Sequence, residues 1–275
     1  MVMAMGTVIT FCNHKGGVGK TTLSVLFAVY QSAVRKDPKR VLVVDMDGQG
    51  NASAILTRRC RGLKQEPDII PFSGNAVKDL FNADLEHVAP MRATYGIDLL
   101  YAEPDDDDVY ALNNCTDESL VLRFIAALQS LRANYDYIVL DPPPQNNFME
   151  KVAIFAADHV VAPIVATSIS SLYGTRSIMD RLSNADIAER LLGVLFYMIP
   201  ERPTRVTKNK LDTLRASLGD LALNHTVSSR QVVTNAQDIN LSLWSYPGSR
   251  TAATEYECVF TELEKRIRKR AGGKL

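Results

Sequence analysis

The sequence predicts an α/β fold in which a doubly wound, mostly parallel sheet is flanked by helices. The first observation is an apolar, β-prone run at 8–12, followed by a glycine-rich loop and then a helical run at 23–34. The second is a pair of continuously apolar runs, 41–45 and 137–141, which each end in a carboxylate, as buried parallel strands often do. The third is the alternation of strands and helices along the rest of the chain.

The glycine-rich loop at 15–22 has the composition of a phosphate cradle. Its glycines allow backbone N–H groups to turn toward an anion, and the N-terminus of the following helix adds partial positive charge. Lys20 can reach the β- and γ-phosphates of a nucleotide, and the Thr21 hydroxyl can ligate Mg²⁺. The residues expected to line the cradle are Lys15, Gly16, Gly17, Val18, Gly19, Lys20, Thr21 and Thr22.

Three carboxylates follow two of the predicted strands. Asp141 ends the run at 137–141 and is followed by three prolines, a Walker B pattern in which the carboxylate holds Mg²⁺ through a water. Asp45 and Asp47 come at the end of the run at 41–45, and ligands of open α/β sheets bind beyond that edge. The alternative is that Asp45 and Asp47 only cap the helix that follows.

Periodicity predicts the remaining elements. Apolar residues at helical spacing indicate an amphipathic helix at 117–133. The acidic run 103–108 has the composition of a solvated turn. We expect further strands at 97–101, 158–163 and 191–199, and further helices at 171–190, 206–218 and 251–270.

Two motifs resemble those of the ParA/MinD ATPases. Lys15 resembles the first lysine of that family's deviant Walker A loop, and 45–51 is similar to the family's D-x-D-P-Q-G-N segment, with Gly48 in place of the proline. The motifs occur in the family's order, and the likeness extends from about residue 6 to 265. The resemblance implies a P-loop NTPase fold with ATP and Mg²⁺ as cofactors. It also implies a single domain over 1–275, similar to the short Soj-like class that lacks a separate N-terminal DNA-binding domain.

The same resemblance assigns roles to individual residues. Lys15 would cross a dimer interface to the partner's nucleotide, Lys20 would bind phosphate, and Asp47 would orient the attacking water. The loop at Met198 and Pro200 lies where relatives surround the adenine base. The metal site would consist of Thr21, Asp45 and Asp141.

The resemblance further implies a slow, Mg²⁺-dependent ATPase that dimerises with ATP, binds DNA nonspecifically and drives partition of plasmid or chromosomal DNA. A ParB-like or adaptor protein would stimulate it, and it would be cytoplasmic and associated with the nucleoid. The net charge is zero overall, but 201–275 carry +5 and 1–200 carry −5. The candidate DNA contacts are therefore Arg202, Arg205, Arg230, Lys265, Arg266, Arg268, Lys269 and Arg270; the alternative for each is a solvated charge.

Other functions remain open or are disfavoured by the sequence. A MinD-like membrane switch would need an amphipathic C-terminal helix, and Val259, Phe260, Leu263 and Ile267 do form a stripe, although we expect it to pack on the core. A cargo-positioning ATPase would carry the same motifs. A ligase similar to dethiobiotin synthetase would have no reason for the segment at 45–51. An iron–sulfur carrier or nitrogenase-like reductase would need paired interface cysteines.

Composition narrows the class further. The four cysteines stand at 12, 60, 115 and 258 without a C-x-x-C pair, so neither a zinc site nor a redox motif is indicated. The first residues lack the basic and apolar regions of a signal peptide. Both observations favour a cytosolic protein, and no stretch is long and apolar enough to predict a membrane span.

Overall fold

The computed structural model describes residues 5–60, 66–82, 87–165 and 169–272. Its centre is a seven-stranded sheet in the order β5-β6-β2-β7-β1-β8-β9. All neighbouring strands run parallel except β5 beside β6, so the predicted α/β class is confirmed. The strands are β1 (Thr7–Phe11), β2 (Val41–Asp45), β5 (Met91–Arg92), β6 (Asp98–Leu100), β7 (Tyr137–Asp141), β8 (His159–Val165) and β9 (Leu191–Tyr197); a separate antiparallel pair consists of β3 (Arg58–Arg59) and β4 (Asp68–Ile69).

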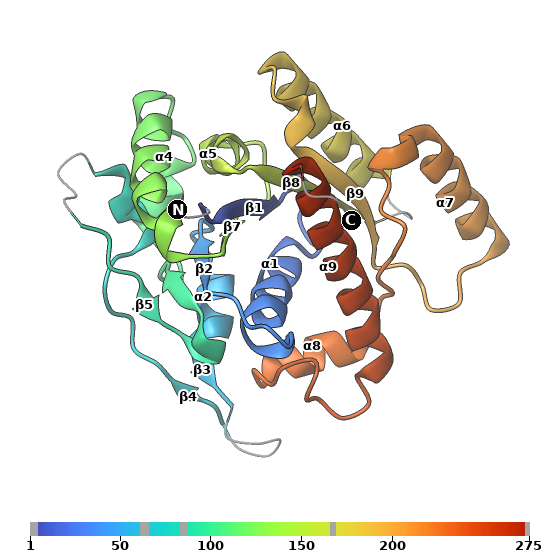
Figure 1. Ribbon diagram of the computed structural model, residues 1–275, viewed down its shortest axis with the longest axis horizontal. Helices are drawn as coiled ribbons and strands as arrows, with labels where there is room; N and C mark the ends of the chain where they lie inside the picture. The colour runs from blue at the N-terminus through green and yellow to red at the C-terminus, as the bar shows by residue number, and fades with distance from the viewer. Residues whose placement is uncertain (1–4, 61–65, 83–86, 166–168, 273–275) are drawn as a thin grey trace.

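Helices cover both faces of the sheet, as Figure 1 shows. One face packs against α1 (Lys20–Val29), α2 (Asn51–Leu56), α8 (Gln231–Asp238) and α9 (Arg250–Arg270). The other face packs against α3 (Asp107–Leu112), α4 (Ser119–Leu131), α5 (Phe148–Ala156), α6 (Ile169–Asn184) and α7 (Arg205–Leu218). The central strands are apolar throughout because successive side chains enter opposite cores: Val8 enters one and Ile9 the other.

Several predicted boundaries differ from the observed ones. The first helix begins at Lys20 rather than at residue 23, because Gly19 adopts a left-handed conformation that lets the helix start directly after the loop. The helix predicted at 171–190 ends at Asn184. The predictions of a strand at 41–45 and of a terminal helix are confirmed by β2 and α9.

The acidic run 103–108 is not only a solvated turn, so that prediction was wrong in part. Asp106 is 7% exposed and caps α3, because its carboxylate accepts hydrogen bonds from the backbone N–H groups of Asp108 and Val109. Asp107 and Asp108 stand in the first turn, where negative charge is favourable. The charge cluster therefore marks the start of a helix.

The apolar stripe of α9 packs on the core, as expected. Val259, Phe260, Leu263 and Ile267 are all buried in the cluster that also contains residues of α1. Within the described ranges, no helix is long and apolar enough to cross a membrane. The stripe is therefore already covered by the protein itself.

Candidate nucleotide-binding site

The three predicted motifs meet at one edge of the sheet. Strands β2, β7 and β1 are neighbours, so their carboxyl ends lie side by side. The register places Asp45 directly opposite Asp141. The loop after β1 leads into α1, and a Cβ atom on Gly16 would lie 3.7 Å from Pro144, which follows Asp141. Segments far apart in the sequence therefore form one site.

The glycines of the loop are required by its geometry. Gly17 has a φ angle of 72° and Gly19 of 83°, both in the left-handed region that favours glycine. A Cβ atom on Gly19 would lie 2.1 Å from Cε1 of Tyr197. The Tyr197 ring cannot easily withdraw, because it is buried and its hydroxyl is hydrogen-bonded to that of Tyr256 at 2.6 Å. The Tyr197 ring at the end of β9 therefore packs directly against the glycine-rich loop and leaves no space for a side chain at position 19.

Lys20 is poised at the start of α1. Its side chain is buried, and its Nζ donates a hydrogen bond to the carbonyl oxygen of Lys15 at 3.3 Å. Burial lowers the pKa of Lys20, and the negative charge of Asp141 is the largest effect that opposes this fall. A buried ammonium group beside a glycine-rich loop is suited to bind phosphate oxygens.

Asp45 and Asp141 form a pair of fully buried carboxyl groups. Burial, together with the charge of Asp141, raises the pKa of Asp45 to about 8. Burial likewise raises the pKa of Asp141 to about 6, although the hydroxyls of Thr21 and Ser24 oppose the rise. Ser24 donates to Oδ1 of Asp141 at 2.9 Å, whereas Oδ2 is buried without a hydrogen-bond partner.

That unpartnered oxygen fits a cation. The described residues contain no group of three or more His, Cys, Asp or Glu side chains placed to hold a metal on their own. A Mg²⁺ ion would therefore have to be held jointly by Thr21, by Asp141 through a water, and by phosphate oxygens, which is how nucleotide-bound Mg²⁺ is normally held. When bound, the ion would supply positive charge between the phosphates and the carboxylate pair.

The oxygens of Asp45 are already occupied. Oδ2 accepts hydrogen bonds from the N–H of Ser53 at 2.8 Å and from its hydroxyl at 2.7 Å, and Oδ1 accepts from the N–H of Asp47 at 3.2 Å. Asp45 thus holds the start of α2 and the turn before it through Ser53 and Asp47, although the N-cap residue of that helix is Gly50. Its place in the metal site stays a prediction.

Asp47 lies at the edge of the site and is 7% exposed. Burial raises its pKa, while the backbone N–H of Gln49 and the charge of Lys20 oppose the rise. The segment is held from outside by Tyr110 of α3: a Cβ on Gly48 would lie 2.9 Å from that ring, and Gln49 hydrogen-bonds to its hydroxyl. Close packing therefore explains glycine at position 48.

A small pocket lies beside Thr22, at the end of β9. Its volume is about 100 Å³, and Met198, Tyr197 and Gln237 are among its lining residues. Met198 adopts a positive φ of 55° and is 38% exposed. Met198 thus lines a pocket together with Thr22 of the glycine-rich loop, while Pro200 lies exposed further along the same loop as Met198. Adenine binding there stays a prediction.

The predicted DNA contacts fall into two groups. Arg230 contacts Glu201 and Glu255, each at 3.1 Å, and Arg266 contacts Glu262 at 2.9 Å and donates to three backbone carbonyls. Arg270 donates to the carbonyl oxygens of Glu189 and Leu191. These three guanidinium groups are largely engaged within the protein, so the structure gives them an architectural role.

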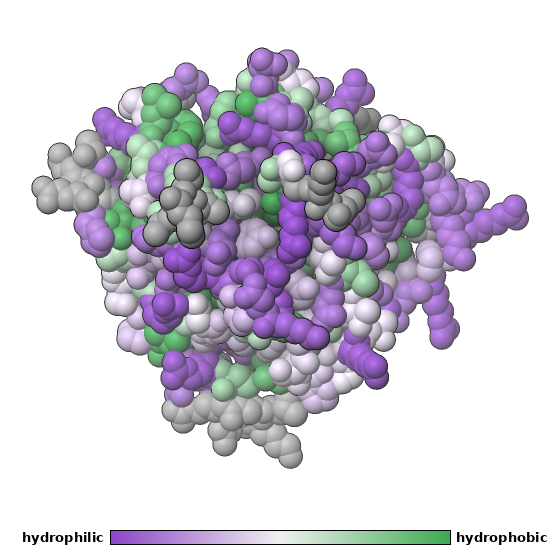
Figure 2. Space-filling view, in the orientation of Figure 1, coloured by the Kyte–Doolittle hydropathy of each residue, from purple (hydrophilic) through white to green (hydrophobic). Residues whose placement is uncertain are grey.

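The second group is more exposed. Arg202 and Arg205 lie at the N-terminal end of α7, where Figure 2 shows a mostly hydrophilic surface, and Lys265 and Lys269 project from α9. Arg268 is exposed as well and lies 3.6 Å from Glu264. Contact of these residues with DNA stays a prediction.

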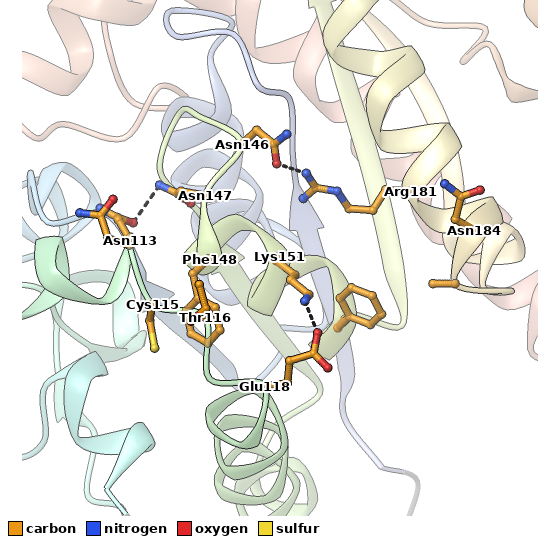
Figure 3. A pocket seen from close by; sticks show the side chains of 13 residues that line it. Asn113, Cys115, Thr116, Glu118, Asn146, Asn147, Phe148, Lys151, Arg181 and Asn184 are labelled. Carbon is orange, nitrogen blue, oxygen red and sulfur yellow. Dashed lines mark hydrogen bonds and ion pairs between the residues drawn. The ribbon is translucent and has the colours of Figure 1, made fainter.

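A larger groove lies next to the site, between α5, α6 and the segment that joins α3 to α4. Figure 3 shows its lining, in which Arg181 of α6 hydrogen-bonds to Asn146 and Lys151 of α5 pairs with Glu118. Its volume is about 790 Å³. Asn146 belongs to the loop that begins at Asp141, so one wall of the groove continues into the nucleotide site.

Sequence reasoning missed several residues of the site. Ser24 and Ser53 hold the two buried aspartates, and Tyr197 lies against the P-loop. Helix α5 was not predicted, although Asn147 followed three positions later by Glu150 is a helix-start pattern. That pattern was the available signal for Glu150, which the structure places directly behind the P-loop.

Comparison with known sequences points to one family. A protein-family model described as an AAA domain matches residues 6–190. The chain is 31% identical over 204 residues to the sporulation initiation inhibitor protein Soj of Bacillus subtilis, covering 72% of this chain and 75% of that protein. It is 26% identical over 268 residues to the chromosome-partitioning ATPase Soj of Treponema pallidum, covering 95% and 98%.

Solved structures share the fold. A putative plasmid partition protein from Borrelia burgdorferi bound to AMPPNP has a TM-score of 0.76 at 20% identity, covering 95% of this chain and 100% of that one. The cell division ATPase MinD of Pyrococcus furiosus has a TM-score of 0.67 at 19% identity, covering 95% and 99%. At these identities the likeness establishes the fold alone.

The sheet order, the glycine-rich loop and the buried aspartates define a P-loop nucleotide-binding protein with a second lysine in its Walker A loop. With the sequence matches, the assignment becomes specific: the chain belongs to the ParA/MinD family of P-loop ATPases. The resemblance predicted from Lys15 and the segment at 45–51 is thereby confirmed.

Proposed function

We propose that this protein is an ATP-driven dimerising switch of the ParA type. Two copies close on ATP and Mg²⁺, the closed dimer binds DNA without sequence preference, and hydrolysis opens it. A ParB-like or adaptor partner accelerates the opening, and the cycle partitions plasmid or chromosomal DNA. In this proposal residues 1–275 act as one domain, in the cytoplasm and on the nucleoid.

The observation that carries the proposal is the convergence of buried Lys20 and the unpartnered Oδ2 of Asp141 on one glycine loop. In such a site, the Lys20 ammonium group can bind phosphates and the Asp141 carboxylate can face a magnesium ion, both at the same edge of the sheet. The sequence relatives add support, because one of them is named as a chromosome-partitioning ATPase.

Hydrolysis would use groups at the rim of the site. Asp47 is 7% exposed, and in this proposal its carboxylate orients a water at the γ-phosphate. The charge of Lys20 stabilises the ionised form of Asp47. Lys15 would add a further positive charge from the opposite subunit, where it would offset charge developing on the phosphate.

DNA binding would use the exposed cations near α7 and at the end of α9. Neutralisation of DNA phosphates releases counterions, so the affinity should fall steeply with salt and depend little on sequence. Dimer closure would double the number of cations that face one duplex. A membrane-binding switch is less well supported, because the stripe of α9 is buried.

The test is a gel shift on nonspecific duplex DNA with ADP, ATP or a slowly hydrolysed analogue, run beside light scattering. We expect a dimer and a shifted band with ATP or the analogue, and a monomer with ADP. Lys20→Ala serves as the control, since it should lose ATP binding. A wild-type protein that stays monomeric with ATP and Mg²⁺ and ignores DNA contradicts the proposal.

A further inference from the structure

A buried carboxylate behind the P-loop has no part in the mechanism proposed above. Glu150 of α5 is fully buried. Its Oε1 accepts a hydrogen bond from the Cys12 thiol at 3.2 Å, and its Oε2 lies 2.6 Å from Nδ1 of His14. Burying a carboxylate is unfavourable unless it is paired. Oε2 of Glu150 and Nδ1 of His14 approach each other without hydrogen-bond geometry, so the imidazole can offset the buried charge only as an ion-pair partner.

The local sequence predicts that Glu150 would form a capping box with Asn147, but the structure shows a different contact. Asn147 caps α5, because its side chain accepts a hydrogen bond from the N–H of Glu150 at 2.9 Å. In a capping box, the carboxylate three residues later returns to the N-cap N–H. Here it points inward to the P-loop instead. A tertiary contact, and not the helix end, therefore determines its direction.

Glu150 also contacts the other wall of the site. Nη1 of Arg181 lies 3.6 Å from Oε2 of Glu150, and the Arg181 guanidinium hydrogen-bonds to Asn146 (Figure 3). Asn146 lies in the loop that begins at Asp141. The carboxylate thus connects the P-loop with α6, and through Arg181 with the loop after β7.

At the P-loop, this contact fixes the residue before Lys15. The backbone N–H of Lys15 donates to Oδ1 of Asn13 at 3.0 Å, and its carbonyl oxygen accepts from Lys20 at 3.3 Å. His14 lies between these anchors and is tied to Glu150. The direction in which the Lys15 side chain leaves the loop therefore depends on the pair His14–Glu150.

We propose that Glu150 is a positioning residue for the deviant lysine: through His14 it fixes the backbone from which Lys15 extends, and through Arg181 it couples that backbone to the loop after Asp141. The inference rests on the proposed ATPase switch and names a residue that tunes it. Glu150 acts on Lys15 in the closed dimer, whereas the glycine loop and Lys20 bind the phosphates in each subunit. Its loss should therefore affect turnover more than nucleotide binding.

The test is a double-mutant cycle with Glu150→Gln and His14→Ala, read out by steady-state ATP hydrolysis and ATP-dependent light scattering without DNA or partner. We expect each single change to lower kcat about tenfold or more, because small misplacements of a charge reduce catalysis strongly, with the KM for ATP within about threefold. The double variant should be no slower than the slower single variant. His14→Gln keeps an N–H donor and should restore kcat to within about threefold of wild type.

Glu262→Gln is the matched control. Glu262 is also a buried glutamate, and it lies 2.8 Å from Nδ1 of His225 and 2.9 Å from Arg266, on α9. Its replacement should lower the urea midpoint much as Glu150→Gln does, yet leave kcat and KM unchanged. The inference is wrong, while the proposed function stands, if wild type hydrolyses ATP and Glu150→Gln has the kcat and KM of wild type. The same holds if Glu150→Gln changes only the urea midpoint, as Glu262→Gln is expected to do. A wild type without ATPase activity contradicts the proposed function instead.

Discussion

Asp141→Asn should stabilise the nucleotide-free protein while abolishing efficient hydrolysis. Asp141 is fully buried opposite Asp45, and its buried charge raises the free energy of the apo fold when its carboxyl group is ionised. Asparagine keeps the shape and can still accept the hydrogen bond from Ser24. The variant therefore removes a buried charge without opening a cavity, and it also removes the negative charge expected to face Mg²⁺.

The magnitude follows from the pKa of Asp141. Its rise from 3.8 to about 6 corresponds to about 3 kcal/mol of stability lost on ionisation, at about 1.4 kcal/mol per pKa unit. The folded-state pKa is above the unfolded one, so this loss begins near pH 3.8 and is complete above about pH 6. Because the charged hydrogen bond from Ser24 is weakened in the variant, we expect a net gain of ~1–3 kcal/mol at pH 7.5.

Urea denaturation measures this gain directly. The free energy of unfolding of wild type and Asp141→Asn should be compared at pH 4.5 and pH 7.5, with EDTA and without nucleotide. The gain should be larger at pH 7.5, where wild-type Asp141 is ionised. Asp37→Asn is the control: that carboxylate is exposed and paired with Lys39, so its loss should leave the urea midpoint nearly unchanged at both pH values. An Asp141→Asn variant that is less stable than wild type at pH 7.5, or equally shifted at both pH values, refutes the reasoning.

Three further predictions concern the same site. Asp47→Ala should trap an ATP-bound dimer that still binds DNA and turns over about a hundredfold more slowly; wild-type turnover in a single-turnover assay would remove its role. Lys15→Ala should weaken ATP-dependent dimerisation or hydrolysis at least about tenfold, and unchanged light scattering and rates would contradict the contact across the dimer. Gly19→Ala should destabilise the fold by ~2–5 kcal/mol, because the added methyl meets the Tyr197 ring at a positive φ; an unchanged urea midpoint would contradict the packing.

The meeting of the three motifs at one edge of the sheet was largely predictable because their determinants are local. The glycine loop, Lys20 and the carboxylates that end β2 and β7 each follow a buried strand directly. In a parallel sheet such strand ends share one edge, so the motifs had to meet. The same logic fails for Asp106: charge alone suggested a solvated turn, and the helix it caps depends on packing of Val109 in the core.

The residues available to contact DNA, in contrast, could not be predicted from the sequence alone. The basic excess of the last quarter of the chain is visible from composition, but Arg230 and Arg266 are held by glutamates that approach from other segments or the previous helical turn. A charge counted along the chain is therefore not a charge available to a partner. The exposed residues near α7 and α9 are the ones that composition and structure together leave for this role.

The class of fold and the family could be inferred from the chain alone, and the same short segments predict the residues proposed to cradle phosphate, since all three depend on local spacing. The availability of the basic side chains to a partner and the direction of the Glu150 side chain depend instead on contacts between distant segments. That carboxylate lies 138 residues from the Cys12 thiol that it contacts. Local periodicity carries no information about such a pairing, because the folding of the whole sheet brings α5 and the P-loop together.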